Sequence, residues 1–330
     1  MFYKVKPQEE VKVRMSYYID RYVKWGEETT WATAVTPSTF SNYLLHFEGG
    51  WTDNRVDEPV IAGQRDAKSR TYVHREVAAV MRVQPVSARW FEFCLGSVAT
   101  AAGGSLPATI TPGTVLPSIT AERVYRPVPG SENNALKLWG LKVDTWELTI
   151  EQQEDIVLEM NFAGHDATLE TVSYSPPEID YTVPAAAFHN ASLKYNGDKI
   201  RFRRLVISGD NNLEARFESG GTIGNTFCCQ ELREGGCEIS GRLQLDTSLS
   251  TYAAHVLSRS EGTLECSIQT SAATIVITLN NVAFGEYREP ITGLDVIEVE
   301  IPFSCRRVDE DTPAIEIVQK GSGLWTSLKY

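Results

Sequence analysis

Apolar and polar residues alternate along much of this chain, and the clearest alternation lies in a segment that occurs twice. Residues 134–162 align without a gap on residues 275–303, at a shift of 141 positions, with ten matched apolar or aromatic positions. The last four matched pairs recur at every second residue and end at Phe162 and Phe303. This period is typical of a β-strand with one buried face. The pattern therefore predicts that each copy ends in a half-buried strand.

A second repeat lies upstream of the first. Residues 76–90 align on residues 238–252 at a shift of 162, which places Trp90 on Tyr252. The two shifts differ by 21 positions, so the first copy should carry about that many extra residues, and we place this insertion around 97–133. A repeat this long indicates a duplicated domain and not a solenoid. A length of 330 residues also favours two domains.

Shorter patterns predict the other elements. Asn196-Gly197 should form a hairpin turn, because both residues tolerate positive φ. A short helix is expected at residues 87–95, with Ser87 as its N-cap, and again at 248–257. The remaining predicted strands are 43–47, ended by Gly49-Gly50, and 76–83, 118–125, 188–195, 200–207, 264–270, 274–287 and 296–303.

Two long polar segments lack a sustained apolar period and are expected to be loops. They are residues 51–71 and, at about the equivalent place in the second copy, residues 220–236. Loops of this length are usually functional or disordered. The charge-free stretch 93–121 contains three prolines, so it indicates a loop and not a membrane span. Residues 315–318, with three β-branched side chains, are expected to add a strand to the sheet edge of a neighbour.

We therefore expect a mainly β fold with two domains. A proline-containing stretch at 164–184 marks the boundary between them. The expected parts are an N-terminal arm at 1–30, a first β domain at 31–170, a linker at 171–185, a second β domain at 186–308 and a C-terminal tail at 309–330. Bulky aromatic residues are expected in the cores, namely Trp31, Trp90, Trp139, Trp146 and Tyr252.

The charge of the chain limits its partners. The formal net charge is −12 and the isoelectric point is near 5.0. A surface that neutralises nucleic-acid phosphates is usually basic, so tight nucleic-acid binding is not expected, although this charge is compatible with DNA that slides past. The first eleven residues contain charged side chains and no apolar segment, so no signal peptide is expected either.

Motifs for catalysis and metal binding are not evident. The five histidines are scattered without HxxxH or HExxH spacing, and no GxSxG sequence occurs. Six cysteines are expected to be reduced thiols, because no secretory signal is expected. Cys228, Cys229 and Cys237 are close enough in sequence to give three zinc ligands, but they lack a CxxC pair and a nearby histidine. We expect no metal, no cofactor and no enzymatic activity.

The repeated order of strands, short helix and long loop resembles the tail tube proteins of tailed phages and viruses over residues 26–318. DIVLEMNFAGHDA at 155–167 and LDVIEVEIPF at 294–303 are similar to the strand that ends such a tube domain. FHNASLKYNGDKIRFRRLVISGDNNLEA at 188–215 resembles its opening hairpin and the strand after it. The resemblance implies two tandem tail-tube-type β-sandwich or barrel domains, each with one short flanking helix and long loops.

The resemblance also implies a role as the major tail tube subunit, a structural virion protein. A chain with two tube domains should form a ring of three with pseudo-six-fold symmetry, and the rings should stack helically into a hollow conduit for genome ejection. The implied partners are other copies of the chain, other tail proteins at the tube ends and a length-setting protein, with no membrane. DNA would pass through without specific binding, and the implied location is the virion tail, after assembly in the host cytoplasm.

Two sets of residues follow from this architecture. Negative charge on a lumen wall would repel DNA phosphates, and the residues expected there are Asp155, Glu159, Glu298 and Glu300. The long loops are expected to reach the next ring, through Trp51, Asp53, Arg55, Asp57, Arg65, Thr222, Asn225, Phe227 and Arg233.

Other interpretations stay open at this point. The acidic strand positions also fit an ordinary solvated sheet face. The same fold fits a minor tail, baseplate or tail completion protein that makes one ring and stops. A two-domain β-sandwich carbohydrate-binding module or hydrolase is a further alternative, which would need an aromatic platform or a buried pair of carboxylates.

Overall fold

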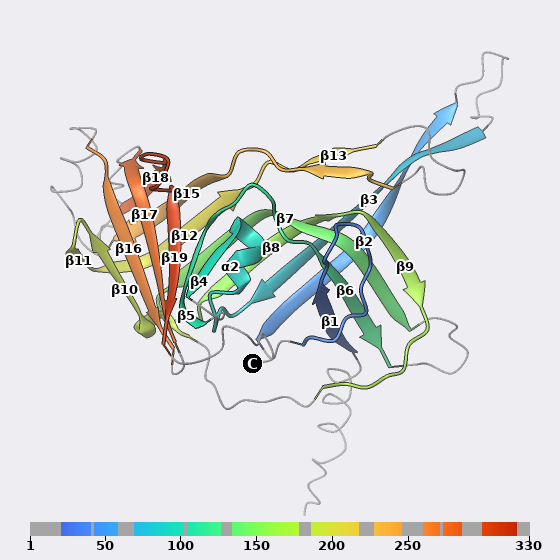
Figure 1. The fold of residues 1–330 in the computed structure, drawn as a ribbon, viewed down its shortest axis with the longest axis horizontal. Helices are drawn as coiled ribbons and strands as arrows, with labels where there is room; N and C mark the ends of the chain where they lie inside the picture. Colours follow the sequence, from blue (N-terminus) through green and yellow to red (C-terminus); the bar gives the residue numbers. More distant parts are fainter. Residues whose placement is uncertain are drawn as a thin grey trace, which may run out of the picture.

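The computed structural model describes residues 21–40, 43–58, 69–101, 105–126, 134–177, 186–217, 228–245, 260–270, 273–285 and 299–321. These residues form a mainly antiparallel β structure with one short helix, which confirms the predicted fold class at that level (Figure 1). The elements of the first half are β1 Arg21–Glu27, β2 Leu44–Glu58, β3 Ser69–Val83, α2 Trp90–Leu95, β4 Gly96–Ala101, β5 Ser105–Pro112, β6 Ile119–Tyr125, β7 Ala135–Glu151, β8 Val157–Gly164 and β9 Asp166–Glu170. Those of the second half are η1 Phe188–Asn190, β10 Ala191–Tyr195, β11 Asp198–Ile200, β12 Phe202–Asp210, β13 Glu214–Arg216, β14 Glu231–Arg233, β15 Glu238–Leu245, β16 Gly262–Gln269, β17 Thr274–Phe284, β18 Val299–Cys305 and β19 Ile315–Lys320.

A central sheet runs through both halves of the chain. Its strand order is β2-β3-β8-β7-β12-β15-β18-β17, and every pairing is antiparallel. The two halves meet where β7 pairs with β12, from Thr145 opposite Asp210 to Glu151 opposite Arg204. The halves are therefore joined by a continuous hydrogen-bonded ladder in addition to the chain between them.

Two smaller sheets lie against the ends of the central sheet and bury one of its faces (Figure 1). The first has the order β1-β6-β7-β9, and the second has the order β11-β10-β16-β17-β19-β5-β4. β7 and β17 each bend from a smaller sheet into the central one. The bends contain Gly140, with φ 67°, and Asn281, with φ 47°, which differ by the repeat shift of 141. Glycine and asparagine are the residues that most readily adopt this backbone conformation.

The order of pairing is the same in both halves. β1, β2, β3, β6, β7, β8 and β9 of the first half correspond in chain order and in neighbours to β10, β12, β15, β16, β17, β18 and β19 of the second. The hairpin of β4 and β5 has no counterpart among the described residues of the second half. Apart from Gly96, it falls inside the insertion that the repeat shifts predict at 97–133.

Alternating side chains build the core, as the sequence pattern predicts. On β8 Leu158, Met160 and Phe162 are buried, and on β18 Ile301 and Phe303 are buried. Trp90 and Trp146 are also in the core, whereas Trp31 and Trp139 are only half-buried and contact the ring of His165, so the core prediction is wrong for those two. Trp25, which the sequence did not indicate, packs 5.4 Å from Trp90 between ring centroids. Tyr252 lies outside the described residues.

The predicted loop at 51–71 is largely wrong. β2 continues through Gly49-Gly50 to Glu58 and pairs with β3 as far as Ser69, so the described parts of this segment form a two-stranded ribbon. A Cβ added to Gly49 would lie 2.5 Å from Leu138 Cδ1, so this glycine allows close packing inside the strand and does not end it. None of the described side chains of this ribbon at 51–55 and 73–76 is buried, so no apolar alternation marked it.

The predicted loop at 93–121 and the predicted free C-terminal strand are also wrong. β4 and β5 form a hairpin there, and β5 pairs with β19. β19 pairs on its other side with β17 of the same chain, with Ile315 and Ile317 fully buried. Residues 315–320 are therefore occupied within the chain and do not reach a neighbour.

Several element boundaries differ from the prediction. The helix begins at Trp90 with Arg89 as N-cap, and Ser87 lies before it, where its hydroxyl accepts a hydrogen bond from the Arg89 N–H at 3.2 Å and donates one to Gln319 Oε1 at 3.0 Å. β1 shows that part of the predicted arm belongs to a sheet, and β9 lies inside the proline-containing stretch 164–184. The turn at Asn196-Gly197 is confirmed, with φ of 49° and 89°, but its return strand β11 ends at Ile200 and β12 joins the central sheet. The predicted helix at 248–257 lies outside the described residues.

Candidate interaction surfaces

One face of the central sheet points away from the core and is polar. Side chains on it alternate with the buried positions of the same strands. An open hollow of about 1210 Å³ lies along this face and is lined in part by Glu147, Asn161, Ser208 and Ser240, from four different strands. On the described strands, the charged residues of this polar face are Glu48, Glu76, Arg82, Glu147, Glu151, Glu159, Arg204, Asp210, Glu238, Arg242 and Glu300.

Every arginine of the polar face is paired with a carboxylate of the adjacent strand. Arg82 Nε lies 2.5 Å from Glu159 Oε2, Arg204 Nε lies 3.3 Å from Glu151 Oε2, and Arg242 Nη1 lies 3.7 Å from Glu300 Oε1. These pairs are exposed, so each contributes little to stability. The pairs compensate the three positive charges of this face on the described strands, so the five other carboxylates leave a surplus of negative charge on these strands.

The predicted lumen residues lie on or beside this polar face. Glu159 and Glu300 are separated by the repeat shift of 141, and both point away from the core and pair with an arginine. Asp155 precedes β8, is exposed and accepts a hydrogen bond from Gln84 Nε2 at 2.7 Å. Glu298 lies outside the described residues.

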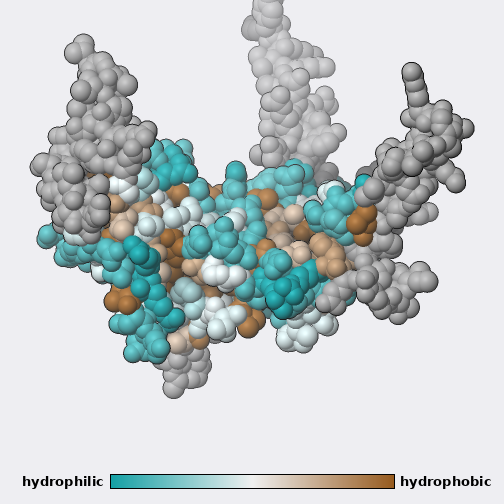
Figure 2. Space-filling view, turned by 90° about the horizontal axis from the view of Figure 1, so that it is seen from above, coloured by the Kyte–Doolittle hydropathy of each residue, from teal (hydrophilic) through white to brown (hydrophobic). Residues whose placement is uncertain are grey.

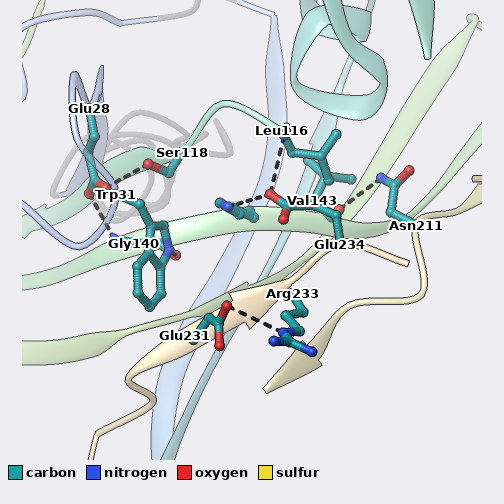
Figure 3. Close-up of polar contacts among 11 residues, drawn as sticks. Glu28, Trp31, Leu116, Ser118, Gly140, Val143, Asn211, Glu231, Arg233 and Glu234 are labelled. Carbon is teal, nitrogen blue, oxygen red and sulfur yellow. Dashed lines mark hydrogen bonds and ion pairs between the residues drawn. The ribbon is translucent and has the colours of Figure 1, made fainter. Parts of the chain in front are cut away.

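The segment between β12 and β15 crosses from the second half onto the first (Figure 1). Asn211, which is 4% exposed, donates from Nδ2 to the carbonyl oxygens of Cys94 at 3.0 Å and Val143 at 2.9 Å. Lys142 Nζ lies 2.5 Å from Glu234 Oε1, and the Lys142 side chain is only 7% exposed. These contacts attach the segment at both of its ends (Figure 3).

Glu234 is held by several donors at this crossing. Burial raises the pKa of its carboxyl group, but the hydrogen bond and charge of Lys142, together with backbone N–H groups, outweigh burial and hold the pKa below its usual value of 4.5. Nearby, Glu28 accepts hydrogen bonds from the Ser118 hydroxyl at 2.8 Å and the Gly140 N–H at 2.7 Å (Figure 3). One signal for this network is visible in the sequence, namely a lysine at position 142 within the otherwise apolar run 138–143.

The residues predicted for contact between rings are divided between two elements. Trp51, Asp53, Arg55 and Asp57 lie on β2, which with β3 forms the ribbon that projects from the molecule (Figure 1). At the base of the ribbon Arg75 Nε lies 2.8 Å from Asp53 Oδ1, and its guanidinium lies 5.4 Å from the centre of the Trp51 ring. Arg233 lies on β14 and pairs with Glu231 at 3.4 Å. Arg65, Thr222, Asn225 and Phe227 lie outside the described residues.

The surface around these elements is mostly hydrophilic. Seen from above in Figure 2, teal residues predominate on the described surface and brown hydrophobic residues form separate patches. The exposed large hydrophobic residues near the ribbon are Trp51, Val73 and Phe217, and the Phe217 ring packs against the His74 ring in a tilted arrangement with 4.4 Å between ring centroids. Among the described helices none is long and apolar enough to cross a membrane.

The cysteines do not form a metal site in the described part of the chain, where no group of three potential ligands was found. All six are free thiols. Burial is the largest cause that raises the pKa of Cys228 and of Cys266 to about 12, so both are protonated at neutral pH.

Comparison with known families identifies the chain. The family model described as "Phage tail tube protein" matches residues 19–305. The chain belongs to the phage tail tube protein family. It is therefore a structural subunit of a phage tail tube and not an enzyme, it assembles with itself into a tube, and it is located in the virion tail. A comparison with curated proteins finds no match.

Proposed function

We propose that this tail tube protein consists of two tandem tube-type units and supplies one third of each ring. The repeated pairing order, the matched bends at Gly140 and Asn281 and the single β4–β5 insertion support this division. The paired strands extend the first unit back to Arg21 and the second unit forward to Lys320, beyond the boundaries expected from the sequence. Three such chains place six similar units around an axis.

The ring would stack on the next ring through a head-to-tail contact. Such a contact does not close on itself and therefore generates a filament. The β2–β3 ribbon is the best-supported stacking element, because it leaves the body of the molecule as a paired strand and carries Trp51 and Val73 partly exposed (Figure 1). Exposed apolar side chains grouped on a projecting element are typical of an interaction site.

We further propose that the polar face of the central sheet lines the lumen. The single observation that carries this proposal is the continuous sheet of both units, which exposes eight carboxylates and three arginines, each arginine paired with a carboxylate. A wall with surplus negative charge repels DNA phosphates. Because no arginine of this face is left without a carboxylate, strong attachment points for the genome are lacking on the described strands.

The test is negative-stain electron microscopy of the purified protein across a range of concentrations, with native mass spectrometry of the smallest assemblies. We expect hollow tubes, and rings that contain three chains but show six similar units in class averages. Single rings that never stack would indicate a tail completion or baseplate role. Monomers at every concentration would contradict the self-assembly of this chain by itself.

A second experiment tests the stacking role of the segment between β13 and β14. Residues 218–227 are replaced by a short Gly-Ser linker, while Glu234 is retained because it pairs with Lys142. We expect folded subunits that form rings but not tubes, measured by sedimentation and microscopy. Long tubes of normal appearance would show that this segment does not contribute to stacking.

A further inference from the structure

The smaller sheet of the first half ends in an open edge at β9. Within the described part of the chain β9 has one ladder, with β7, whereas its counterpart β19 lies between β17 and β5. We infer that the edge of β9 is a docking site for a β-strand of a different protein, which pairs with β9 in the way that β5 pairs with β19. The inference rests on the two-unit division proposed above and adds a partner on the outside of the tube.

The first argument is that Leu169 of β9 lacks a cover that its counterpart has. Leu169 lies opposite Leu136 of β7. Ile317 of β19 lies opposite Ile277 of β17, and the repeat shift of 141 carries Leu136 to Ile277. Leu169 and Ile317 are therefore equivalent. Ile317 pairs on its other side with Ile110 of β5 and is fully buried, whereas Leu169 is 52% exposed.

The second argument concerns the direction of the backbone groups. Asn280 N–H donates to Ala314 O at 2.9 Å in continuation of the β17–β19 register. Hydrogen-bonded pairs alternate along an antiparallel ladder, so the even-numbered residues of β19 bond to β17 and the odd-numbered ones face β5. In β9, Asn134 N–H donates to Glu170 O at 3.1 Å, so the even-numbered residues there bond to the β7 side. The N–H and C=O groups of Leu169 therefore face the open edge.

The third argument is that the beginning of β9 is protected and the part around Leu169 is not. Ala167 N–H donates to Asp166 Oδ1 at 2.8 Å, and Arg75 Nη1 lies 3.1 Å from the same oxygen. A side chain thus takes the place of a partner strand at this end, which is one way in which proteins block unused sheet edges. The unprotected part is short, and it matches the ladder of β5, which pairs with three residues of β19.

The chain supplies one hairpin for two equivalent edges. It has 35 residues between β3 and β6, including the β4–β5 hairpin, and 16 residues between β15 and β16. The difference is about the length of that hairpin, which extends from Gly96 to Pro112. Because β5 is already bound to β19 of its own chain, a second copy has no spare β5 to present to β9. The strand that docks on β9 therefore comes from a different protein.

The chemistry of the partner follows from β5. This strand contains no charged residue, and it buries Ala108 and Ile110 fully. Both charged residues of β9 are already paired, Asp166 with Arg75 and Glu170 with Lys137. The partner strand should therefore be uncharged, with a β-branched residue opposite Leu169, and main-chain hydrogen bonds should supply much of its affinity.

The edge of β9 stays accessible in the proposed tube. The smaller sheets cover the buried face of the central sheet, and the polar face proposed for the lumen is the opposite one. β9 is an outer strand of its sheet (Figure 1) and would lie on the outside of the tube, three times in each ring. A strand of another tail protein can therefore reach it after the rings have stacked.

A peptide with the sequence of residues 96–112 serves as the probe. Its ends are joined by a short Gly-Ser linker, because Gly96 lies opposite Pro112 and closure holds the hairpin in its paired form. Hydrogen exchange of the Leu169 amide is measured in subunits and in tubes, with and without the peptide. We expect fast exchange without the peptide and exchange at least about 10-fold slower with it, while the Ile317 amide, which faces β5, is unchanged. The same peptide with Ile110→Lys is the control and should protect neither amide.

Three results of this experiment would overturn the inference. One is a Leu169 amide that is already slow in the subunit, because the edge would then be filled within the chain. Another is a lack of protection at a peptide concentration of about 1 mM, which corresponds to very weak binding. The last is protection of Ile317 instead of Leu169. A natural protein that never assembles would contradict the proposed function, but the exchange test on its subunits would still decide the docking site.

Two matched substitutions identify who uses the edge. Leu169→Val and Leu169→Pro both shorten the apolar side chain, but only proline removes the N–H that faces the open edge. We expect both variants to form tubes, and Leu169→Pro to bind the peptide at least about 10-fold more weakly than Leu169→Val. Equal binding would contradict the pairing. A folded Leu169→Pro subunit that cannot form tubes would show that a second copy occupies the edge, which would overturn the inference. If Leu169→Pro fails to fold, the exchange experiment on the unchanged protein decides alone.

Discussion

At the scale of single residues, the contact between the two halves depends on polar groups that are nearly buried. Lys142 and Glu234 come from different halves, and neither charge has free access to water, with side chains 7% and 23% exposed. Breaking such a pair leaves one charge without its partner, which costs more than the pair contributes when intact. This asymmetry makes Lys142 a sensitive probe of the crossing segment.

We predict that Lys142→Met destabilises the protein by about 1–3 kcal/mol in urea unfolding, discounted for the partial exposure of Glu234. Lys199→Met, on the exposed strand β11, is the control and should change stability by less than about 0.5 kcal/mol. Adding Glu234→Gln to Lys142→Met should recover part of the loss, because no carboxylate then lacks its partner. A double variant no more stable than Lys142→Met would argue against the pairing.

The same pair predicts a pH dependence. The folded-state pKa of Glu234 is below its usual value of 4.5, so the ionised form stabilises the folded protein. This contribution is present above the unfolded-state pKa and is lost as the pH falls through the lower folded-state value. The stability difference between the natural protein and Glu234→Gln should therefore be constant near neutral pH and shrink below about pH 4.5. A difference that grows on acidification would contradict this assignment.

At the scale of elements, the β7–β12 junction depends on a glycine. A Cβ added to Gly209 would lie 2.2 Å from Trp146 Nε1, whereas a Cβ added to Gly50 of β2 would meet nothing within 4 Å. We predict that Gly209→Ala destabilises the protein by about 2–4 kcal/mol through overpacking, while Gly50→Ala changes stability by less than about 1 kcal/mol. Chemical denaturation measures both. Equal effects would mean that Trp146 can move aside without cost.

Elements with one buried face were predictable from sequence, and elements fixed by distant contacts were not. Leu158, Met160 and Phe162 alternate with polar residues, so β8 was evident. Asn196-Gly197 marked the turn between β10 and β11 through local backbone preference. The described ribbon side chains at 51–55 of β2 and 73–76 of β3 include no buried residue that would leave a pattern. Ser87 could be recognised as a cap candidate, but its partner Gln319 lies 232 positions away, and no local signal reveals that bond.

The candidate site shows the same division. The repeat and the alternation identified Glu159 and Glu300 as equivalent residues facing away from the core. Their pairing with Arg82 and Arg242 depends on which strands are neighbours, and so does the junction of β7 with β12. Pairing between strands far apart in sequence is set by packing of the whole molecule, which single-sequence patterns do not report.

At the scale of the whole molecule, the charge of the polar face should control how DNA moves through the tube. We predict that Glu147→Lys with Glu238→Lys leaves tubes intact but slows DNA ejection from reconstituted particles, because both positions would then attract phosphates. The effect should weaken as salt increases. Glu316→Lys on β19, outside the polar face, is the control and should eject at the normal rate. Normal ejection by the double variant would contradict the lumen assignment.

The β4–β5 hairpin should reduce the symmetry of the tube from six-fold to three-fold. β5 pairs with β19 and so covers the edge of the second unit's smaller sheet. The corresponding strand of the first unit is β9, where Leu169 is 52% exposed and, among the described residues, β7 provides the one ladder. A ring of three chains would therefore carry three hairpins on six similar units. We predict that a reconstruction with three-fold symmetry shows a hairpin beside every second unit. If six-fold symmetry is imposed instead, the hairpin density should fall to about half that of the central sheet, because only half of the six positions around the pseudo-symmetric ring carry a hairpin. Six equal hairpin densities would mean that the second unit has a counterpart, and a ring without either pattern would mean that the two units do not alternate around the axis.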